Sequence, residues 1–186
     1  CLLELGGRTL LQRIVDTATP QVGPLVLNTN SEPSLFAGYG LPIAPDVVDG
    51  FAGPLAGVLT GLEWAAANAP GCDWVASFAC DAPFAPRDLV ARLMAAVTRD
   101  GADMACAASG GRDQPVFALW PVRLAGALRD AVVAEEMRKV DIWTARYRLA
   151  RVEFGTAGGD PFFNINRPED LDTAAALLAG TLSSND

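Results

Sequence analysis

Asp81 is the position in this sequence whose type and surroundings point most directly to chemistry. It follows the uncharged run 74–80, which has the composition of a buried strand, and it precedes Ala82-Pro83, which stops a strand. Packing alone rarely places a charge at the end of a buried strand. A carboxylate there can hold a Mg²⁺ ion that also binds substrate phosphates. The alternative is a turn aspartate or the N-cap of the helix that follows.

Two pairs of asparagines have the same one-residue spacing. Asn28 and Asn30 follow the short apolar run 25–27, and their amides offer both donors and acceptors, as the recognition of a base edge requires. Asx turns explain this pair equally well. Asn164 and Asn166 stand just before the last predicted helix, so capping of that helix is the alternative there and accounts for one of the two.

The junction 53–57 joins a loop to a helix. Gly53 allows a close approach of the backbone, Pro54 suits the first turn of a helix, and Leu55 begins the apolar face. Amide groups at such a helix N-terminus suit a nucleotide or a phosphate. Tight packing of small residues against a sheet is the alternative.

The overall charge limits the partners that this chain can bind. The 186 residues include 22 acidic and 14 basic side chains, for a formal charge of −8, and no histidine. The absence of histidine excludes Ser-His and Cys-His nucleophilic pairs and the HExxH zinc helix. Because an acidic protein lacks a basic face, we expect neither nucleic acid nor a membrane as partner. Arg138 and Lys139 can supply local positive charge for an anionic substrate, and a solvated helix face is the alternative.

Apolar periodicity and turn residues predict an α/β fold. Strands alternate with helices, which predicts a three-layer, Rossmann-like, mostly parallel sheet with helices on both faces. Ligands bind beyond the carboxyl ends of the strands in such sheets. We expect one domain over 1–180 and a tail at 181–186. The predicted helices are 10–18, 54–68, 87–99, 122–135, 140–147 and 168–178, and the extended segments are 25–27, 42–45, 73–80, 104–108, 115–120 and 149–154.

Seven short motifs occur in a fixed order along the chain. They are LLELGGRTL (2–10), LNTN (27–30), PD (45–46), GPLAG (53–57), ACDAPF (79–84), RDQP (112–115) and FNINRPEDL (163–171). In this order and separation they resemble the MobA-type family of molybdenum cofactor guanylyltransferases. The resemblance implies a nucleotidyltransferase fold like that of the nucleotide-diphospho-sugar transferases.

The resemblance also implies an activity and roles for individual residues. The reaction would transfer GMP from Mg-GTP to the terminal phosphate of molybdopterin, or of its molybdenum-loaded form, with release of pyrophosphate. Asn28, Asp46 and the Gly53-Pro54-Leu55 loop would contact the guanine nucleotide, and Asp81 would bind Mg²⁺. Asn164 and Asn166 would lie where the two substrates meet, with Arg138 and Lys139 as weaker candidates for the charged end of the pterin. Arg112 and Asp113 match a family motif to which the sequence assigns no role.

Family members carry an N-terminal strand and a glycine-rich loop of the form LAGGxSxRMGxxK before the segment that begins here at Cys1. We therefore expect this strand and loop to precede the chain. The four cysteines show no C-x-x-C spacing, which predicts reduced thiols and a cytoplasmic location. We expect a monomer, with molybdenum-insertion and molybdoenzyme-maturation proteins as partners. The competing hypotheses are a cytidylyltransferase or sugar-1-phosphate nucleotidyltransferase of the same fold, and a non-catalytic binding module.

Overall fold

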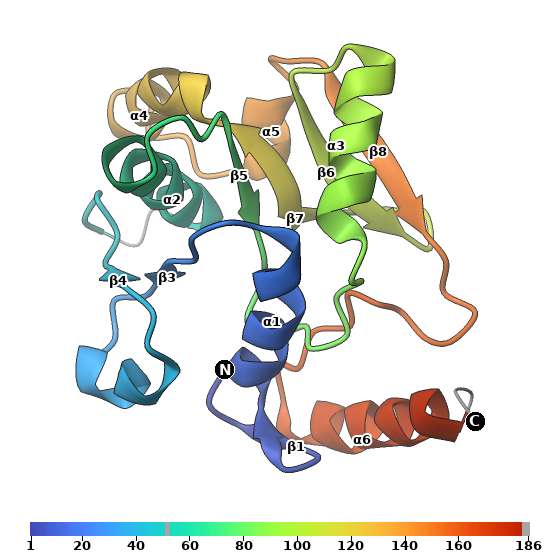
Figure 1. The fold of residues 1–186 in the computed structure, drawn as a ribbon. Coiled ribbons are helices and arrows are strands. Elements are labelled where there is room, and N and C mark those ends of the chain that lie inside the picture. The colour runs from blue at the N-terminus through green and yellow to red at the C-terminus, as the bar shows by residue number, and fades with distance from the viewer. Residues whose placement is uncertain (51–52, 184–186) are drawn as a thin grey trace.

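A four-stranded sheet forms the centre of the computed structural model, which describes residues 1–50 and 53–183. Its order is β5-β7-β6-β8, and the strands span Trp74–Ser77 (β5), Met104–Ser109 (β6), Arg112–Pro121 (β7) and Leu149–Phe154 (β8). β7 is antiparallel to both of its neighbours, whereas β8 is parallel to β6. β5, β6 and β8 therefore run in the same direction, and their carboxyl ends share one edge of the sheet (Figure 1).

The predicted α/β fold with a central sheet is confirmed, and three of the four strands run in the same direction, but β7 is antiparallel to both of its neighbours, which was not predicted. β6 and β7 form a hairpin closed by Gly110 and Gly111, whose φ angles are 54° and 75°. A two-residue turn in which both φ angles are positive has a backbone twist that matches the right-handed twist of the two antiparallel strands it joins. Such a short turn can join only antiparallel strands, which forces β7 to run against the others.

Helices cover both faces of the sheet, as predicted. Alternate residues of the strands face opposite layers: Met104 and Cys106 contact α2, α4 and α5, while Ala105 and Ala107 contact α3. The helices span Leu10–Ala18 (α1), Pro54–Asn68 (α2), Leu89–Asp100 (α3), Ala125–Val133 (α4), Val140–Thr144 (α5) and Pro168–Ser183 (α6). Short 3₁₀ helices span Thr19–Gln21, Pro33–Tyr39 and Val122–Leu124. No helix in residues 1–50 and 53–183 has the length and apolar character needed to cross a membrane.

Two short strand pairs lie outside the main sheet. β3 (Leu27–Asn28) and β4 (Ile43–Ala44) form a parallel pair where extended segments were predicted. β1 (Glu4–Leu5) and β2 (Arg8–Thr9) form a hairpin that was not predicted.

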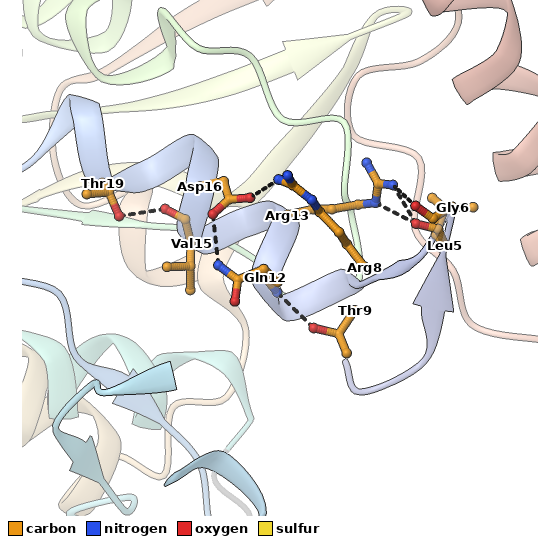
Figure 2. A network of polar contacts seen from close by, with 9 residues as sticks. All are labelled: Leu5, Gly6, Arg8, Thr9, Gln12, Arg13, Val15, Asp16 and Thr19. Atoms are coloured by element: carbon orange, nitrogen blue, oxygen red, sulfur yellow. Dashed lines mark hydrogen bonds and ion pairs between the residues drawn. The ribbon is translucent and has the colours of Figure 1, made fainter. Parts of the chain in front are cut away.

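The guanidinium of Arg13 in α1 fixes this hairpin, because its Nε donates to the Leu5 carbonyl at 3.0 Å and its Nη2 reaches the same oxygen (Figure 2). Gln12 and Arg8 both donate to Asp16 on the exposed side of α1, at 2.8 Å and 2.6 Å. The hairpin and the first turns of α1 therefore behave as one unit.

The last helix packs against this hairpin, away from the main sheet (Figure 1). Leu5, Leu10, Ile165 and Ala174 form a small apolar cluster of their own there. α6 begins at Pro168 as predicted but continues to Ser183. The predicted tail is therefore helical at 181–183, and 184–186 lie outside the described residues.

Candidate functional site

Asn28, Asn30 and Asp46 form one hydrogen-bonded cluster at the ends of β3 and β4. The parallel register of Leu27 with Ile43 brings these ends together. Nδ2 of Asn28 donates to Oδ1 of Asp46 at 2.9 Å, and Nδ2 of Asn30 donates to Oδ2 at 2.9 Å. The Asp46 N–H returns a bond to Oδ1 of Asn30 at 2.8 Å. The two amides thus fix the Asp46 carboxylate, so Asx turns do not account for the asparagine pair.

The first turn of α2 lies directly against this cluster. A Cβ atom on Gly57 would lie 2.6 Å from Oδ1 of Asn28, so only glycine allows the Asn28 amide to rest on the helix. The Val47 N–H donates to the Thr60 hydroxyl at 3.0 Å, which ties the loop after Asp46 to the same helix. Close packing therefore explains Gly57, and the same contact brings Asn28 and Asp46 to the N-terminus of α2.

Gly53 and Pro54 open α2 in the way that the sequence predicted. Gly53 has φ 73°, a conformation that disfavours other residues, and Pro54 occupies the first turn. The Leu55 side chain is fully buried, so only its backbone amide is available to a ligand. The N-terminus of this 15-residue helix presents amide groups and a partial positive charge beside Asp46.

A cavity of about 370 Å³ extends from this cluster toward Asp81. Asn28, Asp46 and Gly53 are among its lining residues at one end, and Cys80, the neighbour of Asp81, is another. Most of the remaining lining is apolar and comes from α1, α2, β3 and β5. Burial raises the pKa of the Cys80 thiol, so this group is neutral at physiological pH. The cavity therefore connects the two regions that carry most of the predicted site residues.

Asp81 lies in a turn four residues beyond β5, which ends at Ser77 rather than at Cys80 as predicted. It is not an N-cap, because α3 begins at Leu89 and Asp88 occupies that position. The Asp81 carboxylate is partly buried, and within the described part of the chain it has no hydrogen bond or ion pair. A carboxylate left without a partner is suited to bind a cation.

The Asn164–Asn166 segment lies beside Asp81. The Ile165 N–H donates to the Asp81 carbonyl at 2.8 Å, and the buried Ile165 side chain leaves Asn164 and Asn166 exposed on either side of it. Capping of α6 by one of these asparagines was the alternative, and the structure contradicts it. Oδ2 of Asp170 accepts from the Asn166 and Arg167 N–H groups at 2.8 Å and 2.9 Å.

The Asp81 carboxylate fits Mg²⁺, which prefers one or two carboxylates together with water and phosphate oxygens. The residues described by the structure contain no group of three or more His, Cys, Asp or Glu side chains placed to hold a metal. A cation at Asp81 would therefore take most of its ligands from the substrate and from water.

Arg138 and Lys139 lie beside the N-terminus of α2 but differ in what they can do. A Cβ atom on Gly53 would lie 3.5 Å from the Arg138 carbonyl oxygen. Nη1 of Arg138 donates to the carbonyls of Val132 and Met137 at 3.0 Å and 3.2 Å, so this guanidinium stabilises its own loop. Lys139 is exposed at the start of α5, has no ion pair among the described residues and is the single lysine of the sequence.

Sequence reasoning missed two residues that support the site. Thr60 holds the loop after Asp46, and nothing in its sequence context distinguishes it from other helical threonines. Asp170 holds the Asn166 backbone, and its position two residues after Pro168, in the first turn of a predicted helix, was a signal that could have found it.

Comparisons with known proteins place this chain among nucleotidyltransferases. Residues 1–149 match the family model described as "MobA-like NTP transferase domain". A molybdenum cofactor guanylyltransferase from Bradyrhizobium sp. (strain ORS 278) is 53% identical over 94% of this chain and 82% of its own length. One from Mesorhizobium japonicum is 48% identical over 98% of this chain and 88% of its own length.

Solved structures show the same fold at lower identity. Molybdopterin-guanine dinucleotide biosynthesis protein A from Archaeoglobus fulgidus is 21% identical with a TM-score of 0.73, covering 96% of this chain and 89% of that one. A 4-diphosphocytidyl-2C-methyl-D-erythritol synthase from Anaerococcus prevotii is 15% identical with a TM-score of 0.73, covering 95% and 88%.

Proposed function

The chain belongs to the MobA-like NTP transferase family of nucleotidyltransferases, and from this membership we propose that it transfers GMP from Mg-GTP to the terminal phosphate of molybdopterin. The products are pyrophosphate and the guanine dinucleotide form of the cofactor. The observation that carries the proposal is the Asp46 carboxylate, which two asparagine amides hold against the N-terminus of α2.

The guanine nucleotide binds at the Asn28–Asp46 cluster, beyond the carboxyl ends of β3 and β4. The guanine edge presents N–H donors, which a fixed carboxylate such as Asp46 accepts. Asn28 keeps the Asp46 carboxylate oriented, so little conformational freedom is lost on binding. The Gly53–Leu55 backbone contacts the base and ribose, and its amides donate to the nucleotide.

The transfer itself needs no side-chain base. An oxygen of the acceptor phosphate, already anionic at pH 7, attacks the α-phosphorus of GTP, and the bond from that phosphorus to the bridging oxygen of pyrophosphate breaks. Mg²⁺ at Asp81 supplies neutralisation of the phosphate charge. Asn164 and Asn166 orient the acceptor phosphate through amide N–H groups, and Lys139 attracts the charged end of the acceptor from the other side of the α2 N-terminus. Catalysis is then in-line positioning with charge neutralisation.

The cavity also supports the expected strand before Cys1. Two segments that are distant in sequence, 25–28 and 75–80, line two of its sides, and α1 and α2 supply its other walls. Within the described residues β3 pairs only with β4 and β5 only with β7, so each has an unpaired edge. We propose that a strand from residues before Cys1 pairs with both edges and carries the glycine-rich loop to the phosphates.

Hydrogen exchange tests this arrangement. In protein that carries the preceding residues, the backbone amides of 75–80 should exchange more slowly than in the chain that begins at Cys1, and GTP should bind more tightly. Equal exchange and equal GTP binding would contradict the inserted strand.

The reaction is tested by incubating the protein, including the residues before Cys1, with Mg²⁺, molybdopterin and either GTP or CTP. We expect release of pyrophosphate and formation of the dinucleotide with GTP. Transfer from CTP alone would replace the proposal with a cytidylyltransferase, and a failure with both nucleotides would favour a non-catalytic binding module. Cytoplasmic location, a monomeric state and docking of molybdenum-insertion or molybdoenzyme-maturation proteins stay predictions.

A further inference from the structure

A partly buried polar network links the β6–β7 hairpin to the chain that enters the Asn164–Asn166 segment. Ser109, at the carboxyl end of β6, is 1% exposed, and its hydroxyl donates to Oδ1 of Asp160 at 2.8 Å. Nε2 of Gln114 in β7 donates to the same hydroxyl oxygen at 3.1 Å. Oδ1 of Asp160 also accepts from the Phe162 N–H at 3.0 Å. The two strands of the hairpin and a segment about 50 residues further along the chain therefore meet at one hydroxyl group.

The segment that leaves this network has a second anchor at the site. Phe162 is buried against Phe117 and Phe154, with ring centroids 4.7 Å and 5.4 Å apart. Three residues later the Ile165 N–H bonds to the Asp81 carbonyl. The chain from Asp160 to Ile165 is thus held at both ends, and Asn164 lies between the anchors.

The network adds little to the fold that other contacts do not already supply. The ladders of β6 with β7 and β8 are made by backbone groups and do not use the Ser109 side chain, and the aromatic cluster already holds Phe162 in the core. What the Ser109 hydroxyl fixes is the orientation of Asp160, and with it the direction in which the chain leaves the sheet toward Asn164.

We propose that Ser109, Gln114 and Asp160 are positioning residues that hold Asn164 and Asn166 in register with Asp81. This proposal rests on the proposed function, because it assigns the two asparagines to the acceptor phosphate. It also gives a role to the RDQP motif, to which the sequence alone assigned none. Gln114 binds Ser109, and Asp113 pairs with Arg151 of β8 and holds the start of β7.

The positioning role predicts a particular split in the kinetics. Ser109→Ala removes the hydroxyl and frees Asp160, so the rate constant kcat for GMP transfer should fall about tenfold to hundredfold, since a shift of about 1 Å in a positioning group has that effect. The KM for GTP should change less than about twofold, because the nucleotide binds at Asn28 and Asp46. Thr144→Val removes a buried hydroxyl of α5 that has one hydrogen bond, at 3.2 Å, and serves as the matched stability control.

Two substitutions of Asp160 separate positioning from a direct role for its charge. Asp160→Asn keeps an oxygen that accepts from Ser109 and Phe162, so it should keep kcat within about threefold of the wild type. Asp160→Ala removes that acceptor and should lose activity as Ser109→Ala does. An equal loss in both Asp160 variants would overturn the proposal, because a negative charge and not a position would then be needed.

Amide exchange gives a readout that does not depend on turnover. The Ile165 N–H should exchange at least about tenfold faster in Ser109→Ala and in Asp160→Ala than in Thr144→Val, because a freed segment opens more often. Unchanged exchange at Ile165, or an unchanged kcat in Ser109→Ala, would refute the positioning role. If the wild-type protein transfers no GMP, the proposed function fails on its own, and the exchange at Ile165 still decides whether the network holds this segment.

Discussion

Replacing Gly57 by alanine tests whether the Asn28–Asp46 pair binds the nucleotide. The new Cβ would lie 2.6 Å from Oδ1 of Asn28, a distance at which one of the two groups must move. The Asn28 amide cannot rotate freely, since its Nδ2 is bonded to Asp46 at 2.9 Å and to the Ala44 carbonyl at 3.1 Å. We therefore expect the substitution to break the bond to Asp46.

The size of the effect follows from these bonds. A hydrogen bond to a charged group contributes about 1.5–3 kcal/mol, and if the oriented Asp46 carboxylate binds guanine, a loss of that size weakens GTP binding about tenfold to hundredfold. Stability should change much less, because alanine in place of a helical glycine gains about 0.5–1 kcal/mol and offsets part of the loss. The expected signature is a raised KM for GTP with only a modest fall in the midpoint of thermal unfolding.

The assay is steady-state GMP transfer at varied GTP, with thermal unfolding of each variant. Gly126→Ala in α4 is the control, since a Cβ there meets no atom within 4 Å. In an Asn28→Ala background the clash is absent, so Gly57→Ala should then have little further effect on KM. An unchanged KM for GTP in Gly57→Ala alone would refute the assignment of this cluster to the nucleotide.

Three further predictions concern the metal, the acceptor and acid stability. Asp81→Asn should abolish transfer without lowering the midpoint of thermal unfolding. Asp73→Asn, at the other end of β5, should leave both the turnover and the unfolding midpoint unchanged. An acylating reagent should label the exposed Lys139 amine, and molybdopterin should slow labelling of the peptide that contains it, as peptide mass spectrometry would measure; Lys139→Ala should raise the acceptor KM. Hydrogen bonds from the Arg148 backbone and the Arg123 side chain lower the pKa of Asp103. Its stabilising contribution should therefore be present above the ordinary carboxyl pKa and be lost as pH falls through the lowered value, so Asp103→Asn should flatten the acid side of the stability curve.

The sequence predicted most of the secondary structure because the relevant signals are local. Apolar spacing over 10–18 predicted α1 at Leu10–Ala18, and Pro54 marked the start of α2 at the residue where the structure has it. β8 also has its predicted bounds, Leu149–Phe154. The β1–β2 hairpin was missed because its strands have two residues each, which is too short for a periodic pattern.

The partners of the site residues could not be predicted, because they depend on contacts between distant segments. The sequence singled out Asn28 and Asp46 separately, but their bond depends on the parallel register of β3 with β4. Asp81 was expected directly at a strand end, whereas the ladder stops at Ser77 and its link to the asparagine segment is a backbone bond to Ile165. No side-chain pattern signals a backbone bond between residues 84 positions apart.

Charge is the property that most constrains how this site can work. A chain with a formal charge of −8 repels a nucleoside triphosphate and a phosphorylated acceptor over most of its surface. Near the site, the Arg138 guanidinium is engaged by two backbone carbonyls, whereas Lys139, the N-terminus of α2 and the exposed Arg167 beside Asn166 are local positive groups. These few positive groups carry less charge than a nucleoside triphosphate and a phosphorylated acceptor together.

The free Asp81 carboxylate adds to that imbalance unless it holds a cation. A divalent ion there would reverse the local charge and bring both phosphates to the same place, which an additional arginine could not do with the same geometry. Two neutral asparagines beside this ion can orient a phosphate without competing with it for the metal-bound oxygens. One free carboxylate with two amides beside it is therefore consistent with the metal-dependent reaction between two anions that we propose.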